Sequence, residues 1–298
     1  MRVSILIVSY NTKELTLQTL QSVIASLSQS ILLQNNSEII VVDNNSRDES
    51  LAAIKQLATA SAIPITLLAN TKNTGFAHAN NLAIAKATGK VLLLLNSDTL
   101  VPQGAITRLY ERLMQSDSKH LGILAANLRN LDGSPQPQGG ALPNLITLTN
   151  HMLMLDDLPL IGKFLPSTQN QKFQGWVAAT AMAIKKSVID EIGTLDENIF
   201  MYGEDVEFCL RARHHHWDVA ISPDAVITHI QAASSNQKNA VLGEIKGYQY
   251  IWAKHMPLWQ RPVVNTILRL GILLRWLLFA TIGRTEQSRL YRSLLSQV

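Results

Sequence analysis

The residues best suited to chemistry stand at the end of an apolar run. Val91–Leu95 are five consecutive apolar residues, and Asn96, Ser97 and Asp98 follow them directly. An unbroken apolar run is typical of a strand buried on both faces, as in a parallel sheet. A carboxylate at the carboxyl end of such a strand lies where open α/β sheets bind ligands, and Mg²⁺ prefers oxygen ligands. Asp98 is therefore either a metal ligand or, with Asn96, part of a turn that precedes a helix.

Two further groups of residues have the same double interpretation. Glu204 and Asp205 begin a segment in which apolar residues recur at helical spacing. Acidic residues in a first helical turn complement the helix dipole, but a carboxylate near a substrate hydroxyl is also suited to act as a general base. His229 ends the short apolar stretch Val226–Thr228. It is either a metal ligand or a histidine satisfied within the core.

These residues need a sheet that brings them together. The predicted strands in the first hundred residues are Val3–Ser9, Ile39–Val42, Ile65–Leu68 and Val91–Leu95. Because segments with helical spacing separate them, the pattern predicts an α/β fold with a doubly wound, mostly parallel sheet. Parallel strands present their carboxyl ends at one edge, so Tyr10, Asn11, Asp43 and Asp98 are expected to form one composite site. Asn11 and Glu14 are also expected to form a capping box on the first helix.

Composition narrows the class of protein. The chain has 298 residues, 47% of them hydrophobic, which is enough for a sizeable core. Its single cysteine, Cys209, excludes an internal disulfide and fits a reducing compartment. The apolar run at the N-terminus is too short for a signal peptide and is expected to be a strand. No nucleic-acid-binding motif is present, so a nucleic acid partner is not expected.

The net charge of +4 is unevenly distributed. Residues 238–298 hold nine Lys and Arg against two acids, a balance of +7, and the remainder has a balance of −3. The same tail contains the apolar segment Val263–Ile282, which is interrupted by Arg269 and Arg275. A membrane span needs about 20 mostly apolar residues, so two arginines disfavour a span. The pattern favours a helix on an anionic membrane surface, or one packed on the rest of the chain or on a second subunit of a homo-oligomer.

Six fragments, in order along residues 3–235, together carry a family resemblance. They are Ile7–Asn11, Val42–Ser46, Asn73–Phe76, Asn80–Asn81, Leu95–Asp98 and Tyr202–Asp205. As an ordered set they resemble a nucleotide-sugar glycosyltransferase of family 2 with the GT-A fold, and most nearly its bacterial rhamnosyltransferase-like branch. The resemblance implies a GT-A type α/β domain with flanking helices and a C-terminal helical extension.

The resemblance also implies an activity. It implies an inverting enzyme that moves a sugar, with rhamnose favoured, from a nucleotide diphosphate donor such as dTDP-rhamnose or a UDP-sugar. The acceptor would be a hydroxyl of a glycan or lipid-linked glycan in cell-surface polysaccharide synthesis.

The implied roles fall on particular residues. The donor-binding residues would be Ser9, Tyr10, Asn11, Asp43, Asn45, Asn73, Gly75, Phe76, Asn80, Asn96 and Ser97. Asp205 would be the catalytic base with Glu204 beside it, and Trp176 and Tyr202 would lie on the acceptor side. Mg²⁺ or Mn²⁺ would be bound by Asp98 and His229. The family has Asp-x-Asp at this strand end, and this chain departs from it because Asn96 takes the first place.

The expected organisation has three parts. Residues 1–125 would bind the nucleotide sugar, residues 126–237 would hold the acceptor and the base, and residues 238–298 would form the basic, apolar helical tail. The expected location is the bacterial cytoplasm, peripheral on the inner face of the membrane.

Other functions were weighed against this one. A dinucleotide-dependent dehydrogenase is disfavoured because no Gly-x-Gly-x-x-Gly follows the first strand. A sugar-phosphate nucleotidyltransferase is disfavoured as well, because it would need a glycine-rich, basic loop after the first strand. The remaining alternative is a catalytically inactive, membrane-associated carbohydrate-binding or scaffolding protein. The replacement of the family's first Asp by Asn96 favours this alternative.

Overall fold

The computed structural model describes residues 1–115, 120–155, 173–230 and 237–297. Within them the main sheet has nine strands, of which eight follow the order β3-β2-β1-β4-β10-β6-β11-β5, and β8 pairs with β11. These strands are β1 (Val3–Ser9), β2 (Ser37–Asp43), β3 (Ile65–Ala69), β4 (Val91–Asn96), β5 (Thr99–Leu100), β6 (Leu121–Arg129), β8 (Phe173–Gln174), β10 (Ala181–Lys185) and β11 (Asp218–His229). A small second sheet pairs β7 (Gly139–Gly140) with β9 (Trp176–Val177).

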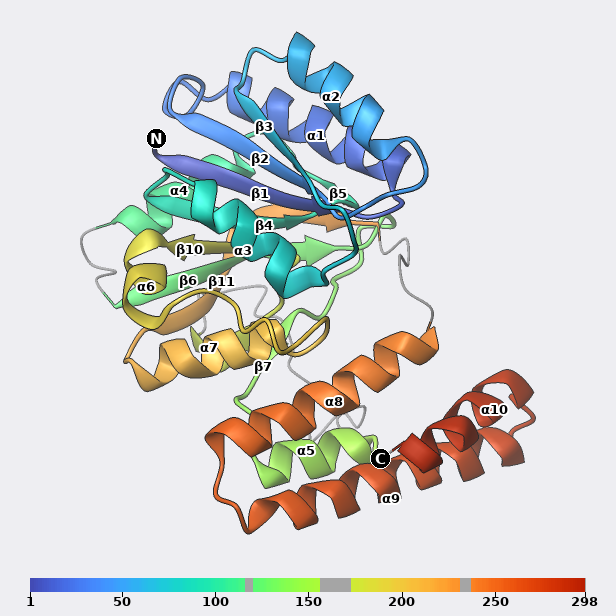
Figure 1. Cartoon of the computed structure of the whole chain (residues 1–298). Helices are drawn as coiled ribbons and strands as arrows, with labels where there is room; N and C mark the ends of the chain where they lie inside the picture. The colour runs from blue at the N-terminus through green and yellow to red at the C-terminus, as the bar shows by residue number, and fades with distance from the viewer. Residues whose placement is uncertain (116–119, 156–172, 231–236, 298) are drawn as a thin grey trace.

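Some of the helices pack on the two faces of this sheet, and others form a separate group beside it (Figure 1). They are α1 (Lys13–Ser28), α2 (Ser50–Ala60), α3 (Phe76–Lys86), α4 (Ala105–Met114), α5 (Leu145–Met152), α6 (Lys186–Ile192), α7 (Glu204–His214), α8 (Gln237–His255), α9 (Gln260–Thr281) and α10 (Thr285–Leu294), followed by the 3₁₀ turn η2 (Leu295–Gln297). The pairs β3-β2, β2-β1, β1-β4 and β6-β11 are parallel, whereas β10 runs antiparallel to both of its neighbours. The predicted α/β fold with a mostly parallel sheet is confirmed.

The apolar run on β4 is buried on both faces, as its sequence predicts. Leu93 and Leu95 pack in the core shared with α1, α2 and α4, and Leu92 and Leu94 pack in the core shared with α3, α6 and α7. The strand therefore carries no polar side chain until it reaches the edge of the sheet. Helix layers cover both faces, which leaves the strand ends as the natural place for a ligand site.

The C-terminal helices form a third layer with its own core (Figure 1). Helices α8, α9 and α10 pack together with α5, which comes from the middle of the chain. Val206 and Leu210 of α7 belong to the same core, so this layer is attached to the sheet domain through α7. The layer begins at α8, next to the border expected at residues 237/238. The border expected at residues 125/126 falls inside β6, so the first two parts share one sheet.

The expected capping box on the first helix is wrong. Helix α1 begins at Lys13, and its N-cap residue, Thr12, makes no side-chain cap hydrogen bond. Asn11 has a left-handed backbone, with φ at 54°, and its Oδ1 accepts a hydrogen bond from the Arg47 N–H at 2.7 Å. Asn11 therefore joins the loop after β1 to the loop after β2, because a tertiary hydrogen bond takes the place of the local one.

Candidate active site

Strand register brings the polar strand ends to one edge of the sheet. Ser9, the last residue of β1, is paired with Asp43, the last residue of β2. On its other side β1 pairs with β4, where Val8 lies opposite Asn96. Because the three strands are parallel and in register, the segments that follow them, including Tyr10, Asn45 and Ser97, leave the sheet side by side. The Ser97 hydroxyl lies 3.2 Å from that of Thr12, which connects the loops after β4 and β1.

The structure brings Asp98 and His229 into direct contact. The short strand β5 pairs antiparallel with the end of β11, and this pairing sets Thr99 opposite His229. His229 Nε2 lies 3.2 Å from Asp98 Oδ1, and both side chains are largely buried. On the other side of the ring, His229 Nδ1 lies 2.8 Å from the Gln136 side-chain oxygen. An Nδ1–H that donates to Gln136 leaves the Nε2 lone pair directed at the carboxylate side.

This pair suits a divalent cation. A histidine whose second nitrogen is held by an oxygen acceptor is the usual arrangement around a bound metal. A lone pair and a carboxylate facing each other repel unless a proton or a cation lies between them. Among the described residues no group of three or more His, Cys, Asp or Glu side chains gathers for metal binding. A cation at Asp98 and His229 would thus take its remaining ligands from a bound substrate and from water.

Asp43 offers an unused acceptor at the end of β2. Its side chain is 2% exposed. One carboxylate oxygen accepts the Ser46 N–H at 3.1 Å, and the other is buried with no partner in the part of the chain that the structure describes. A buried acceptor without a partner costs free energy, so this oxygen is a natural place for a ligand N–H or O–H. Ser9 does not share this property, because its hydroxyl is buried against Thr16 Oγ1 at 2.9 Å.

The segment Asn73–Phe76 is fixed by contacts inside the fold. The Asn44 amide N–H₂ donates to Asn73 Oδ1 at 3.0 Å and to the Gly75 carbonyl at 3.2 Å. Gly75 has φ at +83°, and a Cβ there would lie 2.4 Å from the Phe200 carbonyl oxygen. The Phe76 N–H donates to that same carbonyl at 2.8 Å. Only glycine fits this position, and the contact ties the segment to the loop that leads into α7.

Asn80 is less available than its place in the motif suggests. It is 1% exposed, and its amide donates to the Phe76 carbonyl at 3.0 Å, one helical turn earlier. Asn80 and Ser9 therefore support the donor-side loops from within. A direct contact of either side chain with a donor stays a prediction.

Glu204 and Asp205 open α7 directly after a tight turn. Tyr202 and Gly203 have φ values of +71° and +105°, so the chain reverses sharply before the helix begins. Asp205 Oδ1 accepts its neighbour's N–H, from Val206, at 2.8 Å, and Oδ2 accepts the Ala179 N–H at 3.3 Å. The next residue, Thr180, accepts the Asn96 N–H at 2.9 Å. A chain of short contacts thus connects Asp205 to the end of β4.

The two carboxyl groups have unusual proton affinities. Burial, together with the negative charge of Asp205, raises the pKa of Glu204 to about 8. Burial also raises the pKa of Asp205, against the lowering effect of the N–H groups that it accepts. Glu204 Oε2 is buried without a partner among the described residues. A carboxyl group of raised pKa binds a proton more strongly than an exposed one, so the buried pair is suited to take up a proton from a substrate hydroxyl.

The two residues predicted to lie on the acceptor side, Trp176 and Tyr202, are found between the sheet domain and the C-terminal layer. Trp176 packs against the cores of both. With His151, Val206 and Tyr248 it lines a small hollow among α5, α7 and α8. The Tyr202 ring packs against α8. A Cβ on Gly243 of that helix would lie 2.8 Å from the ring.

Three contributors to the site were not predicted from the sequence. Gln136 orients His229, the Ala179 N–H holds Asp205, and the Asn44 side chain organises the Asn73 segment. Gln136 and Ala179 lie far from their partners in the sequence. The Pro-rich stretch around Gln136 gives no periodic signal. The Asn44–Asn45 pair after β2 was the one local cue, since polar residues at a strand end had already marked Asp43.

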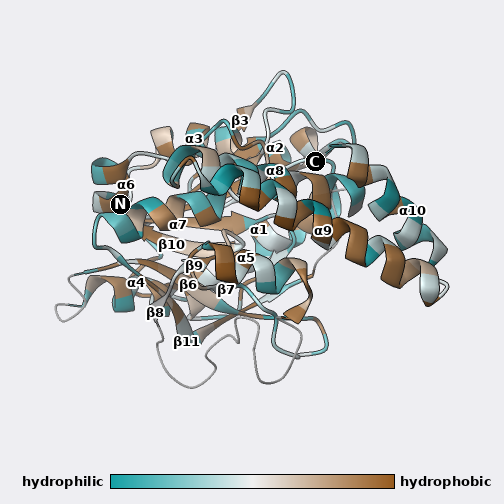
Figure 2. Cartoon of the chain, turned by 90° about the horizontal axis from the view of Figure 1, so that it is seen from below, coloured by the Kyte–Doolittle hydropathy of each residue, from teal (hydrophilic) through white to brown (hydrophobic). Residues whose placement is uncertain are grey.

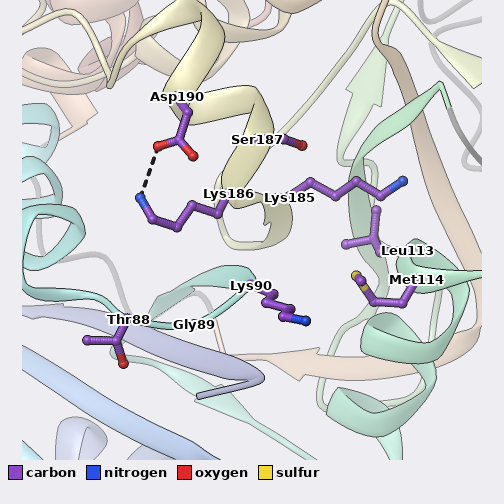
Figure 3. Close-up of a pocket in the computed structure, with 9 residues that line it drawn as sticks. All are labelled: Thr88, Gly89, Lys90, Leu113, Met114, Lys185, Lys186, Ser187 and Asp190. Carbon is purple, nitrogen blue, oxygen red and sulfur yellow. Dashed lines mark hydrogen bonds and ion pairs between the residues drawn. The ribbon is translucent and has the colours of Figure 1, made fainter.

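A hollow of about 430 Å³ lies at the opposite edge of the sheet (Figure 3). Thr88, Gly89 and Lys90, which precede β4, line it together with Lys185 and Lys186. Lys186 forms an ion pair with Asp190 at 3.0 Å. The hollow is separated from Asp43, Asp98 and Asp205 by the length of β4, and it takes no part in the site.

Buried Cys209 is not a nucleophile. Burial raises the pKa of its thiol to about 12, so it stays protonated and fills the core of α7.

Comparisons with known proteins agree with this fold. Solved structures of similar fold include a mannosyltransferase from Pyrobaculum calidifontis in complex with GDP-mannose and Mn²⁺. It has a TM-score of 0.60 at 15% identity, over 99% of this chain and 83% of that one. The Staphylococcus aureus TarS fragment 1–349 matches with a TM-score of 0.56 at 13% identity, over 100% of this chain and 92% of its own. At these identities the likeness shows the fold, which is that of a GT-A glycosyltransferase.

Comparison of the sequence finds a match to one family model and a set of related proteins. Residues 4–128 match the family model described as Glycosyl transferase family 2. A low-salt glycan biosynthesis hexosyltransferase of Haloferax volcanii is 29% identical over 225 residues, which are 72% of this chain and 63% of that protein. An N-acetylglucosaminyl-diphospho-decaprenol L-rhamnosyltransferase of Mycobacterium tuberculosis is 24% identical over 274 residues, covering 83% of this chain and 84% of its own. Residues 4–128 thus match glycosyltransferase family 2, and the relatives that align with most of the chain are named as a hexosyltransferase and a rhamnosyltransferase.

Proposed function

We propose that this chain is an inverting glycosyltransferase that uses a nucleotide diphosphate sugar and a hydroxyl acceptor on a glycan or lipid-linked glycan. The observation that carries the proposal is the position of the Asp205 carboxylate. It is held by two N–H groups, and the segment that holds it also binds the end of β4, where Asp98 and His229 meet. These contacts support a proton acceptor and a pair suited to a divalent cation at the same edge of the sheet.

The reaction follows from these placements. The acceptor hydroxyl oxygen forms a bond to the anomeric carbon while the bond from that carbon to the diphosphate oxygen breaks. Asp205 takes the hydroxyl proton in the same step, and the nucleoside diphosphate leaves with the bonding electrons. Attack from the side opposite the leaving group inverts the anomeric centre. A positioned base of this kind contributes about 10²–10⁴-fold to the rate.

The donor side would be held by three sets of groups. The unpartnered oxygen of Asp43 would accept a hydrogen bond from the base or the ribose. Asn45, Tyr10 and the Gly75–Phe76 turn would line the pocket beside it. Asp98 and His229 would hold Mg²⁺ or Mn²⁺, which when bound stabilises the negative charge that develops on the departing diphosphate. Asn96 in place of a first carboxylate leaves fewer charged ligands, so we expect weaker metal affinity than in an Asp-x-Asp enzyme.

The donor sugar and the location are proposed on narrower grounds. Rhamnose is favoured because the M. tuberculosis relative is named as a rhamnosyltransferase and matches along most of its length. A UDP-sugar is the other candidate. A lipid-linked glycan acceptor at the inner face of a bacterial cytoplasmic membrane fits the basic, apolar C-terminal layer.

The test is release of nucleoside diphosphate from a panel of sugar nucleotides, with and without EDTA. We expect release to need a divalent cation and to be lost in Asp98→Ala and in Asp205→Asn. Asp205→Asn should keep the thermal stabilisation that dTDP or UDP gives with Mn²⁺, because it lies outside the donor contacts. Near-normal turnover in Asp205→Asn would contradict the assigned base.

The inactive carbohydrate-binding protein is the second candidate, and Asn96 is the observation that favours it. It predicts that glycan binding persists while no sugar nucleotide is turned over. A protein without catalytic activity would not need Asp205 to be held in place beside a carboxyl group whose pKa is raised, Glu204. These two observations therefore support the enzyme over the inactive protein.

A further inference from the structure

The C-terminal layer exposes an unusual share of the large apolar side chains. Among the described residues sixteen such side chains are exposed, and eight of them lie between residues 258 and 282. They are Leu258, Trp259, Val263, Leu270, Leu274, Leu277, Leu278 and Ile282. Single exposed apolar residues are ordinary, but a concentration of this kind on α9 and the residues that flank it marks an interaction surface.

Helix α9 has two apolar faces with different surroundings. Val264, Leu268 and Ile272 are buried in the core of the C-terminal layer. Val263, Leu270 and Leu277 recur every seven residues, which places them on one side of the helix, and they are 38%, 53% and 49% exposed. Figure 2 shows hydrophobic residues along α9 on the surface of this layer. We call the exposed side the docking face and define it as Leu258, Trp259, Val263, Leu270, Leu274 and Leu277.

The inward face is held by Arg275. Its guanidinium donates to the His151 carbonyl at 2.8 Å and to the Met152 carbonyl, which are at the C-terminal end of α5. A cation at a helix C-terminus is stabilised by the free carbonyls there. Arg275 is thus turned toward α5 and away from the exposed side of α9. Helix α9 is long and apolar enough to span a membrane by composition, but its inward side is occupied by α5 and α8.

The stretch of chain that carries the docking face has charges of one sign. No Asp or Glu occurs between Glu244 and Glu286, whereas six Lys and Arg do. Lys254 and Arg275 are engaged inside the fold. Lys246, Arg261, Arg269 and Arg284 are exposed. An apolar face with cations around it and no acid in the same stretch of 41 residues complements an anionic lipid surface.

We propose that the docking face binds peripherally to the surface of an anionic lipid membrane, with α9 lying in the plane of the headgroups. A second copy of the chain is the other occupant to consider. Two copies meeting through this face would bring like charges together without an acid in the segment to pair with them. Lipid phosphate groups satisfy those charges, and the acyl chains accept the leucines.

The layer that carries the docking face also borders the predicted acceptor side. Trp176, on the acceptor side, and Tyr248 of α8 line the hollow next to α5, which packs on the inward face of α9. A lipid-linked acceptor anchored in the membrane would therefore meet the layer that borders the site. This last step rests on the proposed function, whereas docking of the face does not.

The experiment is co-sedimentation of the full chain with vesicles of phosphatidylglycerol and phosphatidylcholine in equal parts, and with phosphatidylcholine alone. We expect binding to the mixed vesicles that weakens with added salt, and weaker binding to phosphatidylcholine. Leu270→Ser with Leu277→Ser should lower the vesicle affinity at least about ten-fold. Ile31→Ser, at a side chain that is 92% exposed on the sheet domain, is the matched control and should change nothing.

Charge is tested separately. Arg269→Gln with Arg284→Gln should lower the affinity about 25-fold, from about five-fold for each cation near the surface. Lys55→Gln with Lys86→Gln, which removes two exposed cations from α2 and α3, should leave it unchanged. All these positions are exposed, and circular dichroism and thermal unfolding verify that the variants fold.

Three results would overturn the proposal. One is wild-type protein that stays in the supernatant at low salt, and another is equal loss of binding in the test and control variants. The third is a wild-type dimer that the leucine pair converts to a monomer without any vesicle binding, which would assign the face to a second copy. If vesicles bind but no nucleotide diphosphate stabilises the protein, the proposed function fails and the docking face stands.

Discussion

The turn before α7 offers a test of how precisely the assigned base must be placed. Helix α8 approaches this turn through two glycines one helical turn apart, Gly243 and Gly247. A Cβ on Gly247 would lie 2.5 Å from the Tyr202 carbonyl oxygen and 3.4 Å from the Gly203 Cα. Since α7 begins at Glu204 immediately afterwards, anything that moves the turn moves the base.

The perturbation is Gly247→Ala. Relief of the 2.5 Å contact requires about 1 Å of movement, because carbon and oxygen atoms pack at about 3.5 Å. The turn can hardly move alone, since Tyr202 and Gly203 already have positive φ and Val206 is packed in the core of the C-terminal layer. A displacement of about 1 Å at a catalytic group lowers kcat by about 10²-fold. Overpacking costs about 1–3 kcal/mol of folding stability, and replacing glycine inside a helix returns about 1 kcal/mol.

A matched control lies in the next helix. A Cβ on Gly271 of α9 would lie 2.5 Å from Met152 Cε and 2.9 Å from the Met152 carbonyl oxygen, far from the turn. Gly271→Ala should therefore cost a similar amount of stability without a comparable loss of kcat. The assay is steady-state nucleotide release, with KM for the donor and the thermal midpoint measured on both variants. Equal losses of kcat in the two variants, or full activity in Gly247→Ala, would refute the positioning argument.

Three further perturbations test other parts of the site. Because burial raises the pKa of Glu204 from 4.5 to about 8, the folded protein holds a proton that the unfolded chain releases, and folding stability falls as the pH rises through this range. In Glu204→Gln the thermal midpoint should change less with pH over the same interval, and an unchanged pH dependence would assign the shift elsewhere. Gly75→Ala would place a Cβ 2.4 Å from the Phe200 carbonyl at φ +83°, so we expect a loss of about 2–3 kcal/mol in denaturant unfolding together with weaker dTDP or UDP binding. Gln136→Met removes the oxygen on His229 Nδ1 and should raise the Mn²⁺ concentration needed for half-maximal activity about 10–100-fold, whereas an unaltered Mn²⁺ dependence would exclude His229 as a ligand oriented in this way.

A buried ionic cluster connects α8 to α7, the helix that carries the assigned base. Glu207 of α7 accepts from Arg211, Lys254 and His255, and Lys254 also pairs with Asp196 at 2.6 Å. Burial acts to raise the pKa of Glu207, but the charges and hydrogen bonds of Lys254 and Arg211, together with the hydrogen bond to His255, hold it below its usual range. The cluster ties α7 and the loop before it to α8 close to the base. Breaking one partner would leave a buried charge without compensation, so the C-terminal layer and the site are expected to respond together.

Much of the donor half followed from the sequence because its signals are local. The unbroken apolar run before Asn96 predicted a strand buried on both faces, and β4 is such a strand. Alternation of strands with helical segments fixes parallel pairing, and parallel pairing alone brings the ends of β1, β2 and β4 to one edge. Asp43 and Asp98 could therefore be assigned to one edge without coordinates.

Other features were decided only by the tertiary structure. His229 meets Asp98 because β5 pairs with the end of β11, and Gln136 reaches the histidine from a segment without periodicity. Asn11 does not cap the first helix, and instead accepts a hydrogen bond from the loop after β2. These are contacts between residues far apart in the chain, and no local propensity encodes them.

The C-terminal segment shows the same division most clearly. Its sequence established that it is basic, apolar and helical, and these properties follow from residue type and spacing alone. Which side of α9 is packed depended on where α5 and α8 lie, and Arg275 took the inward side because the carbonyls at the end of α5 are there. Periodicity determines that a helix has faces, but only its neighbours in space determine which face is left for a partner.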